Sequence, residues 1–169
     1  MNYIKHLPIA LVFCLFSCKN GKSSSQVSYI PQDTLTAFYL PAIPAMLNTP
    51  ELRADFLVKH YWDNVNFADT NYIRHPDITE QAWADYCDLL NHVPLSTAQE
   101  AIKKTIARTE TEKKVFDYIT GLADKYLYDP NSPLRNEEFY IPVLEAMISS
   151  SVLTETEKIR PQARIEMAY

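Results

Sequence analysis

Few residues in this chain have the types and the spacing that catalytic or metal chemistry requires. The three cysteines, Cys14, Cys18 and Cys87, form no Cys-x-x-Cys pair, so the motif of a thioredoxin-type redox centre is missing from the sequence. The histidines are scattered and form no His-Glu-x-x-His pattern, and no Gly-x-Ser-x-Gly nucleophile motif occurs. We therefore expect this chain to be no enzyme, with no catalytic residue, metal site or cofactor.

Cys87 is the one thiol that a mature form of the chain would keep free. It lies among apolar residues that recur at helical spacing, between Asp85 and Asp88. A reactive thiolate needs an electropositive neighbourhood, which these two carboxylates do not provide. We interpret Cys87 as a small buried hydrophobic residue, with a reactive thiol as the alternative that substitution by serine would test.

Cys18 has the clearest chemical role, as an acceptor of lipid. A positive charge at Lys5 precedes an apolar stretch, Leu7 to Phe16, which is typical of a signal peptide and too short for a membrane-spanning helix. The string Leu15-Phe16-Ser17-Cys18 resembles a bacterial lipobox, with a bulkier residue than usual at Phe16. We expect residues 1–17 to be a lipoprotein signal peptide and Cys18 to carry acyl chains that anchor the protein to a membrane. The alternative is an ordinary secretory signal that is cleaved near Ser17.

The residues after Cys18 indicate where in the cell envelope the protein lies. No aspartate follows Cys18, so the inner-membrane retention signal is missing. No acidic run follows that would favour export to the cell surface. We expect an outer-membrane lipoprotein that faces the periplasm.

Composition sets the size of the domain and excludes several classes of protein. A chain of 169 residues, 47% hydrophobic and 22% charged, is enough for one globular domain. Glycine occurs only at Gly21 and Gly121, which excludes the glycine-rich loops that bind phosphates. A net charge of −5 is the opposite of the basic surface that a nucleic-acid partner requires.

The elements that must position any site are predicted to be helices. We assign residues 18–45 to a tether and an extended segment, because Pro41 and Pro44 forbid a regular helix there, and residues 46–169 to a helical domain. No window alternates like a half-buried strand. The predicted fold class is all-α, with five to six helices packed as antiparallel helical hairpins in one domain. Its predicted helix-start signals are Thr49-Pro50-Glu51, Thr79, Ser96–Gln99, Thr109–Glu112, Asn136 and Thr154–Glu157.

Gly121 lies inside the most periodic predicted helix, which opens at Thr109–Glu112 and has apolar residues at helical spacing from Val115 to Tyr126. A glycine there costs about 1 kcal/mol relative to alanine. It indicates either close packing against a neighbour or simple tolerance.

Two strings resemble a known family. Residues 46–63 (MLNTPELRADFLVKHYWD) and 125–140 (KYLYDPNSPLRNEEFY) are similar to an uncharacterised helical domain at the N-terminus of bacterial lipoproteins whose C-terminal half is thioredoxin-like. The resemblance covers about residues 40–169 and implies no catalytic residues for the helical part. Relatives continue into the thioredoxin-like domain, whereas this sequence stops at Tyr169, so the resemblance implies an accessory domain without its redox partner.

Two functions follow as hypotheses. The first is a lipid-anchored, non-catalytic interaction module that binds a protein partner or positions a covalently linked redox domain. Aromatic and polar residues suit interfaces, so the candidate contact surface consists of Tyr61, Trp62, Tyr126, Tyr128 and Asn131. The alternative is a cell-envelope lipoprotein that binds a small ligand or glycan in a groove lined by Tyr61, Trp62 or Tyr72.

Overall fold

Apolar residues at helical spacing and well-capped helix ends produce an all-helical domain, seen here in a computed structural model that describes residues 37–168. All described residues belong to one compact unit. Within residues 37–168 there is no strand, so the predicted all-α class is confirmed. The α-helices are α1 (Pro50–His60), α2 (Asn71–Arg74), α3 (Pro76–Leu89), α4 (Leu95–Thr109), α5 (Lys113–Ala123), α6 (Glu137–Ser149) and α7 (Glu155–Ala168).

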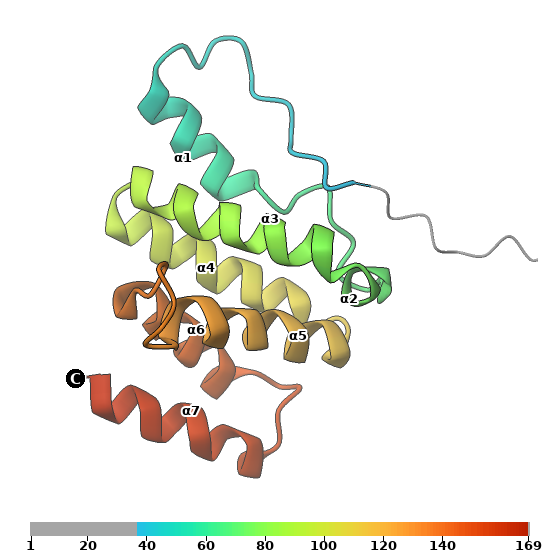
Figure 1. The fold of residues 1–169 in the computed structure, drawn as a ribbon, viewed down its shortest axis with the longest axis vertical. Helices are drawn as coiled ribbons and strands as arrows, with labels where there is room; N and C mark the ends of the chain where they lie inside the picture. Colours follow the sequence, from blue (N-terminus) through green and yellow to red (C-terminus); the bar gives the residue numbers. More distant parts are fainter. Residues whose placement is uncertain (1–36, 169) are drawn as a thin grey trace, which may run out of the picture. The chain divides into compact units, whose positions relative to one another are not determined.

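Helix α4 is the central element of this unit. It packs against α6 most extensively, and also against α5 and α1, while α7 packs on the far side of α6 (Figure 1). The buried residues of α4 recur every three or four positions and include Ala98 and Ala101, whose small side chains let a neighbouring helix approach closely. Helices α1 and α7 consequently lie at opposite ends of the stack of helices (Figure 1).

Two further helical turns continue longer helices. The 3-10 turn η1 (Leu90–His92) follows α3, and the π-helical turn η2 (Asp124–Tyr128) follows α5. In η2 the Asp129 amide donates to the Asp124 carbonyl oxygen over 3.0 Å, a bond that spans five residues. Such π-turns are rare in proteins, and many of those that occur lie at functional sites.

Three predicted helix starts are confirmed. The side chains of Thr49 and Asn136 cap α1 and α6 by accepting from the amides of Leu52 and Phe139, each over 3.3 Å. At α7 the Thr154 hydroxyl accepts from the Glu157 amide, and the Glu157 carboxylate accepts from the Thr154 amide over 2.8 Å. This reciprocal pair is a complete capping box.

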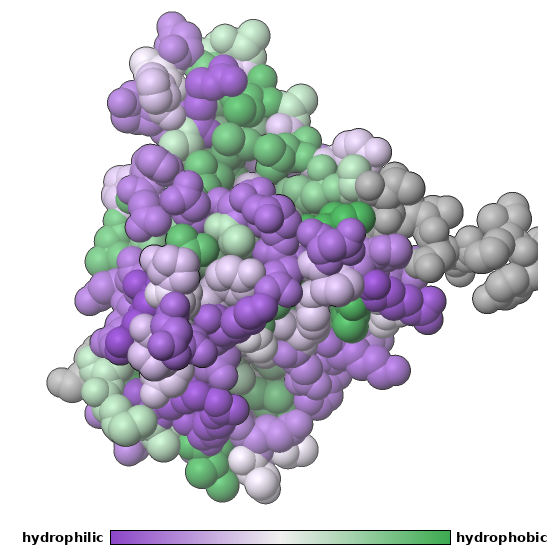
Figure 2. Space-filling view, viewed as in Figure 1, coloured by the Kyte–Doolittle hydropathy of each residue, from purple (hydrophilic) through white to green (hydrophobic). Residues whose placement is uncertain are grey.

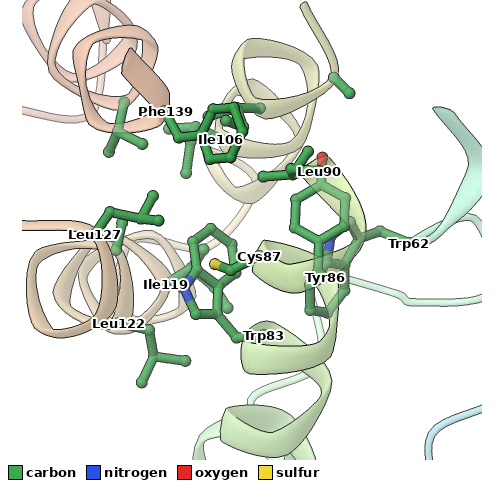
Figure 3. Close-up of a cluster of buried hydrophobic side chains, with 14 of the residues drawn as sticks. Trp62, Trp83, Tyr86, Cys87, Leu90, Ile106, Ile119, Leu122, Leu127 and Phe139 are labelled. Carbon is green, nitrogen blue, oxygen red and sulfur yellow. The ribbon is translucent and has the colours of Figure 1, made fainter. Parts of the chain in front are cut away.

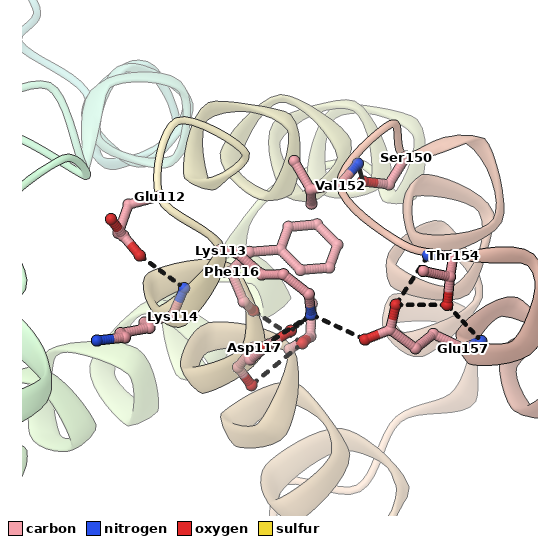
Figure 4. Close-up of polar contacts among 10 residues, drawn as sticks. Glu112, Lys113, Lys114, Phe116, Asp117, Ser150, Val152, Thr154 and Glu157 are labelled. Atoms are coloured by element: carbon pink, nitrogen blue, oxygen red, sulfur yellow. Dashed lines mark hydrogen bonds and ion pairs between the residues drawn. The ribbon is translucent and has the colours of Figure 1, made fainter.

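The other three predicted starts are wrong, because each helix begins at a different residue. Helix α3 begins at Pro76, so Thr79 lies inside it and donates its hydroxyl to the Tyr72 carbonyl over 2.7 Å. Helix α4 begins directly after Pro94, which places Ser96 in its first turn. Thr109 is the last residue of α4, and Glu112 caps α5 by accepting from the Lys114 amide over 3.0 Å (Figure 4).

The core is rich in aromatic rings. Trp62, Trp83 and Tyr86 are buried against one another, with the two indole rings 6.0 Å apart (Figure 3). Phe38 stacks on Tyr61 at 5.1 Å, which fixes the predicted extended segment to the domain. Such aromatic pairs contribute about 0.5–1.5 kcal/mol each beyond the area they bury.

Candidate functional site

A polar network that joins three helical elements surrounds Asp124, the first residue of η2. Its carboxylate accepts hydrogen bonds from the Tyr140 hydroxyl over 2.9 Å, from Arg160 Nη2 over 2.9 Å and from Arg164 Nη1. Arg164 Nη1 also donates to the Tyr140 hydroxyl oxygen over 2.6 Å. One carboxylate thereby joins η2, α6 and α7.

Aromatic rings complete this group. The Arg164 guanidinium carbon lies 4.1 Å from the centre of the Tyr128 ring, and the Tyr128 and Tyr140 rings are 5.1 Å apart. A cation over a tyrosine face is attracted by the negative charge of that face. We call Asp124, Tyr128, Tyr140, Arg160 and Arg164 the Asp124 cluster.

The electrostatics of the Asp124 cluster favour a neutral Tyr140 and a charged Arg164. Burial and the negative charge of Asp124 raise the pKa of the Tyr140 hydroxyl, so this group stays neutral. Burial lowers the pKa of Arg164, but hydrogen bonds and charge from Asp124 and Tyr140 outweigh burial and raise it. Groups that do not titrate near neutral pH are suited to holding elements together and poorly suited to moving protons.

Two clefts flank the Asp124 cluster, and Tyr140, Leu144 and Arg164 line both. One, of about 190 Å³, lies between α5 and α7 and includes Gly121 and Pro161. The other, of about 160 Å³, includes Arg135 and Met167. Pro161 is the only buried residue of α7, and Ile165 packs against the core while partly buried, so the polar bonds of the Asp124 cluster add to a small apolar contact.

The first turn of α7 has a second polar attachment. Lys113 Nζ on α5 lies 2.9 Å from the Asp117 carboxylate and 3.0 Å from that of Glu157 (Figure 4). Hydrogen bonds from the Thr154 amide and from Lys113 lower the pKa of Glu157 to about 2. The start of α7 thus depends on the ionised form of Glu157.

Tyr61 and Trp62, both predicted to lie on a contact surface, are instead core residues. Their exposed fractions are 4% and 2%, and both rings pack against Phe38 and Tyr86. The prediction was wrong for these two residues, because α1 ends at His60 and the turn that follows directs both side chains inward. The same burial removes them from the groove proposed for a ligand or glycan.

Of the other three predicted contact residues, Asn131 is exposed, whereas Tyr126 and Tyr128 are half-buried and pack against the core. Tyr126 donates its hydroxyl to the Glu80 carboxylate over 2.8 Å, and it lines a cleft of about 250 Å³ together with Asn131. The Asn131 amide donates to the Asp129 carboxylate over 2.8 Å, which fixes the loop. Tyr128 belongs to the Asp124 cluster instead. Their role in contacts stays a prediction.

The cysteines and histidines are placed as follows. Cys87 is 2% exposed, and burial raises the pKa of its thiol to about 12, in agreement with a core role. His60 Nδ1 lies 2.7 Å from the Asp63 carboxylate at the surface. Within residues 37–168 no group of three or more His, Cys, Asp or Glu side chains could hold a metal ion. The predicted lipid acceptor, Cys18, lies outside the described residues.

Sequence reasoning missed Asp124, Tyr140, Arg160 and Arg164. Arg160 and Arg164 are four residues apart and so share a face of α7, which was the available signal. Their acceptor lies 36 and 40 residues earlier in the chain, and only the packing of α7 brings it close.

Comparisons with known proteins agree with the helical fold. A family model described as a domain of unknown function (DUF5106) matches residues 17–169. Among curated proteins none is significantly similar to this chain. A solved structure described as that of a thioredoxin-like protein from Bacteroides caccae ATCC 43185 is 76% identical, with a TM-score of 0.77. The similarity covers 80% of this chain and 49% of that chain, so this chain spans about half the length of that protein.

Proposed function

Because this chain belongs to the DUF5106 family of domains of unknown function, we propose that it is a non-catalytic interaction module of a thioredoxin-like lipoprotein. The module would be anchored by lipid on Cys18, at the periplasmic face of the outer membrane. Its role would be to position a thioredoxin-like domain, either covalently linked or bound as a partner.

The observation that carries this proposal is the 76% identity to one half of a protein described as thioredoxin-like. Thioredoxin-like domains contain a β-sheet built from βαβ units, whereas residues 37–168 contain no strand. This contrast supports the assignment of the thioredoxin-like part of that protein to the half that this chain does not match.

The state of Cys87 supports a non-catalytic role. Thiol–disulfide exchange requires an accessible thiolate. Burial of Cys87 and the resulting rise of its pKa to about 12 oppose both accessibility and ionisation. A redox role would then have to come from cysteines of another domain.

The experiment has two readouts on the chain expressed in a bacterial cell with a lipoprotein pathway. The intact mass of the membrane-extracted protein should show acyl chains on Cys18, and a Cys18→Ala variant should lack them and leave the membrane fraction. In a disulfide-reduction assay the chain should show only the background rate, and a Cys87→Ser variant should show the same rate. A rate above background that Cys87→Ser removes would contradict the non-catalytic role, and an unmodified Cys18 would contradict the anchor.

A further inference from the structure

Exposed large hydrophobic side chains gather at one end of the helical unit. Tyr39, Leu40, Met46 and Leu52 are 67%, 51%, 82% and 47% exposed, and all lie within fourteen consecutive residues. In Figure 2 hydrophobic atoms gather at the end where Figure 1 places α1 and the segment before it. We call these four residues the N-terminal apolar surface.

The chain around the N-terminal apolar surface is also free of charge. No Asp, Glu, Lys or Arg occurs from Thr34 to Pro50, in a protein that is 22% charged. Loops exposed to water are normally polar, because they gain nothing from apolar side chains there. Covering this surface would therefore bury apolar area without removing a charged group from water.

The backbone that carries these side chains is held in place from its inner side. Phe38 packs on Tyr61 and Trp62, and Asn64 Nδ2 donates to the Tyr39 carbonyl over 3.1 Å. A turn closed by the Leu47 amide and the Pro44 carbonyl, 3.0 Å apart, presents Met46. The outward side chains thus form a surface that exists before any partner arrives.

We propose that the N-terminal apolar surface rests on the phospholipid bilayer to which the protein is anchored. The inference rests on the proposed acylation of Cys18. Eighteen residues lie between Cys18 and Ala37, a span of at most about 65 Å when fully extended, so the anchor keeps the bilayer within reach of this surface. Apolar side chains beside irregular backbone suit the headgroup boundary, where water still satisfies the backbone, and tyrosine is typical of that boundary.

Charges at the edge of this surface balance one another. On α1, Glu51 and Arg53 have opposite signs, and Lys59 lies 2.9 Å from the Asp55 carboxylate. Contact with the bilayer should therefore depend on apolar insertion and change little with the fraction of anionic lipid.

The test measures amide hydrogen exchange of the mature chain, residues 18–169, coupled through the Cys18 thiol to a maleimide lipid. The vesicles contain phosphatidylethanolamine and phosphatidylglycerol, and the reference sample is coupled to soluble polyethylene glycol instead. We expect exchange in residues 37–49 to slow by about tenfold on vesicles relative to the polymer. Exchange in residues 159–168, at the opposite end of the unit, should be equal in the two samples.

Matched variants separate insertion from unspecific protection. Met46→Asp should abolish the protection, whereas Met167→Asp, at a residue that is 72% exposed on α7, should preserve it. Equal exchange of residues 37–49 on vesicles and on polymer would overturn the proposal. A third sample joins the chain to a thioredoxin-like domain and contains no vesicles. Protection of residues 37–49 in this sample would also overturn the proposal, because the N-terminal apolar surface would then contact that domain and not the bilayer. Because the coupling is chemical, these outcomes do not depend on whether cells acylate Cys18.

Discussion

The side-chain amide of Gln99 donates a hydrogen bond to the carbonyl oxygen of Glu138 over 3.1 Å. In a regular α-helix this carbonyl would accept from the amide of residue 142, but that residue is Pro142, which has no N–H. A side chain of α4 thus supplies the donor that the sequence of α6 lacks.

Gln99→Ala should destabilise the protein by about 0.5–1.5 kcal/mol, the usual net value of one hydrogen bond, because it removes the protein donor to the Glu138 carbonyl. In a Pro142→Ala background the backbone N–H is restored, and the same substitution should cost much less. Urea unfolding of the four proteins of this double-mutant cycle measures the coupling, which we expect to be about 1 kcal/mol. Equal costs of Gln99→Ala in both backgrounds would show that Gln99 acts through some other contact. Gln81→Ala, which removes an exposed amide paired with Asp85, serves as the control.

Asp124→Ala should loosen α7. The substitution removes the acceptor shared by Tyr140, Arg160 and Arg164, and the loss of such charge-assisted bonds costs about 1.5–3 kcal/mol. Hydrogen exchange of residues 155–168 should accelerate by about tenfold or more, while α3 keeps its protection. Asp85→Ala, which removes a carboxylate bonded to Gln81 at the surface, should leave α7 unchanged. An equal acceleration in all helices would indicate global destabilisation instead.

The contribution of Glu157 to stability should depend on pH. Because folding lowers its pKa from 4.5 to about 2, the ionised form is favoured in the native state. Its contribution is therefore complete above about pH 4.5 and is lost as the pH falls toward 2. The Tm difference between the wild type and Glu157→Gln should be largest near neutral pH and should vanish near pH 2. Glu155→Gln, which removes only an exposed ion pair with Lys158, should shift Tm little at any pH.

Cys87 should react with a thiol reagent only when the protein unfolds. With a pKa of about 12, on the order of one thiol in ten thousand is ionised at pH 8, and burial blocks access as well. In Cys18→Ala protein that lacks the signal peptide, the labelling rate with a disulfide reagent should match the rate of global unfolding and rise steeply with urea. Fast labelling without urea would place the thiol at the surface.

Gly121→Ala should stabilise the protein by about 0.5–1 kcal/mol. A Cβ atom at this position would meet nothing within 4 Å, so of the two interpretations of this glycine the structure favours simple tolerance. Thermal unfolding followed by circular dichroism would measure the gain as an increase of several degrees in Tm. A lower Tm would mean that the added Cβ atom clashes with a neighbouring group, and therefore that α5 and α7 lie closer together at Gly121 than this structure shows.

The sequence by itself determined the helical class and the chemistry of several helix ends. Thr49, Asn136 and the pair Thr154 and Glu157 act within four residues of their own positions, and such short-range contacts need no knowledge of the fold. For the helices predicted to start at Thr79, Ser96 and Thr109, short-range patterns did not identify the residue at which each helix begins. Each lies in a segment where a proline or a neighbouring turn sets the boundary.

Tertiary structure decided which residues are buried and which polar groups meet. Tyr61 and Trp62 carry the same aromatic side chains whether they face a partner or the core, and only the turn after α1 directs them inward. The donors to Asp124 come from residues 16 to 40 positions away, and the donor to the Glu138 carbonyl comes from 39 positions away. Helical periodicity describes one segment at a time, whereas these contacts depend on how α4, α6 and α7 pack together.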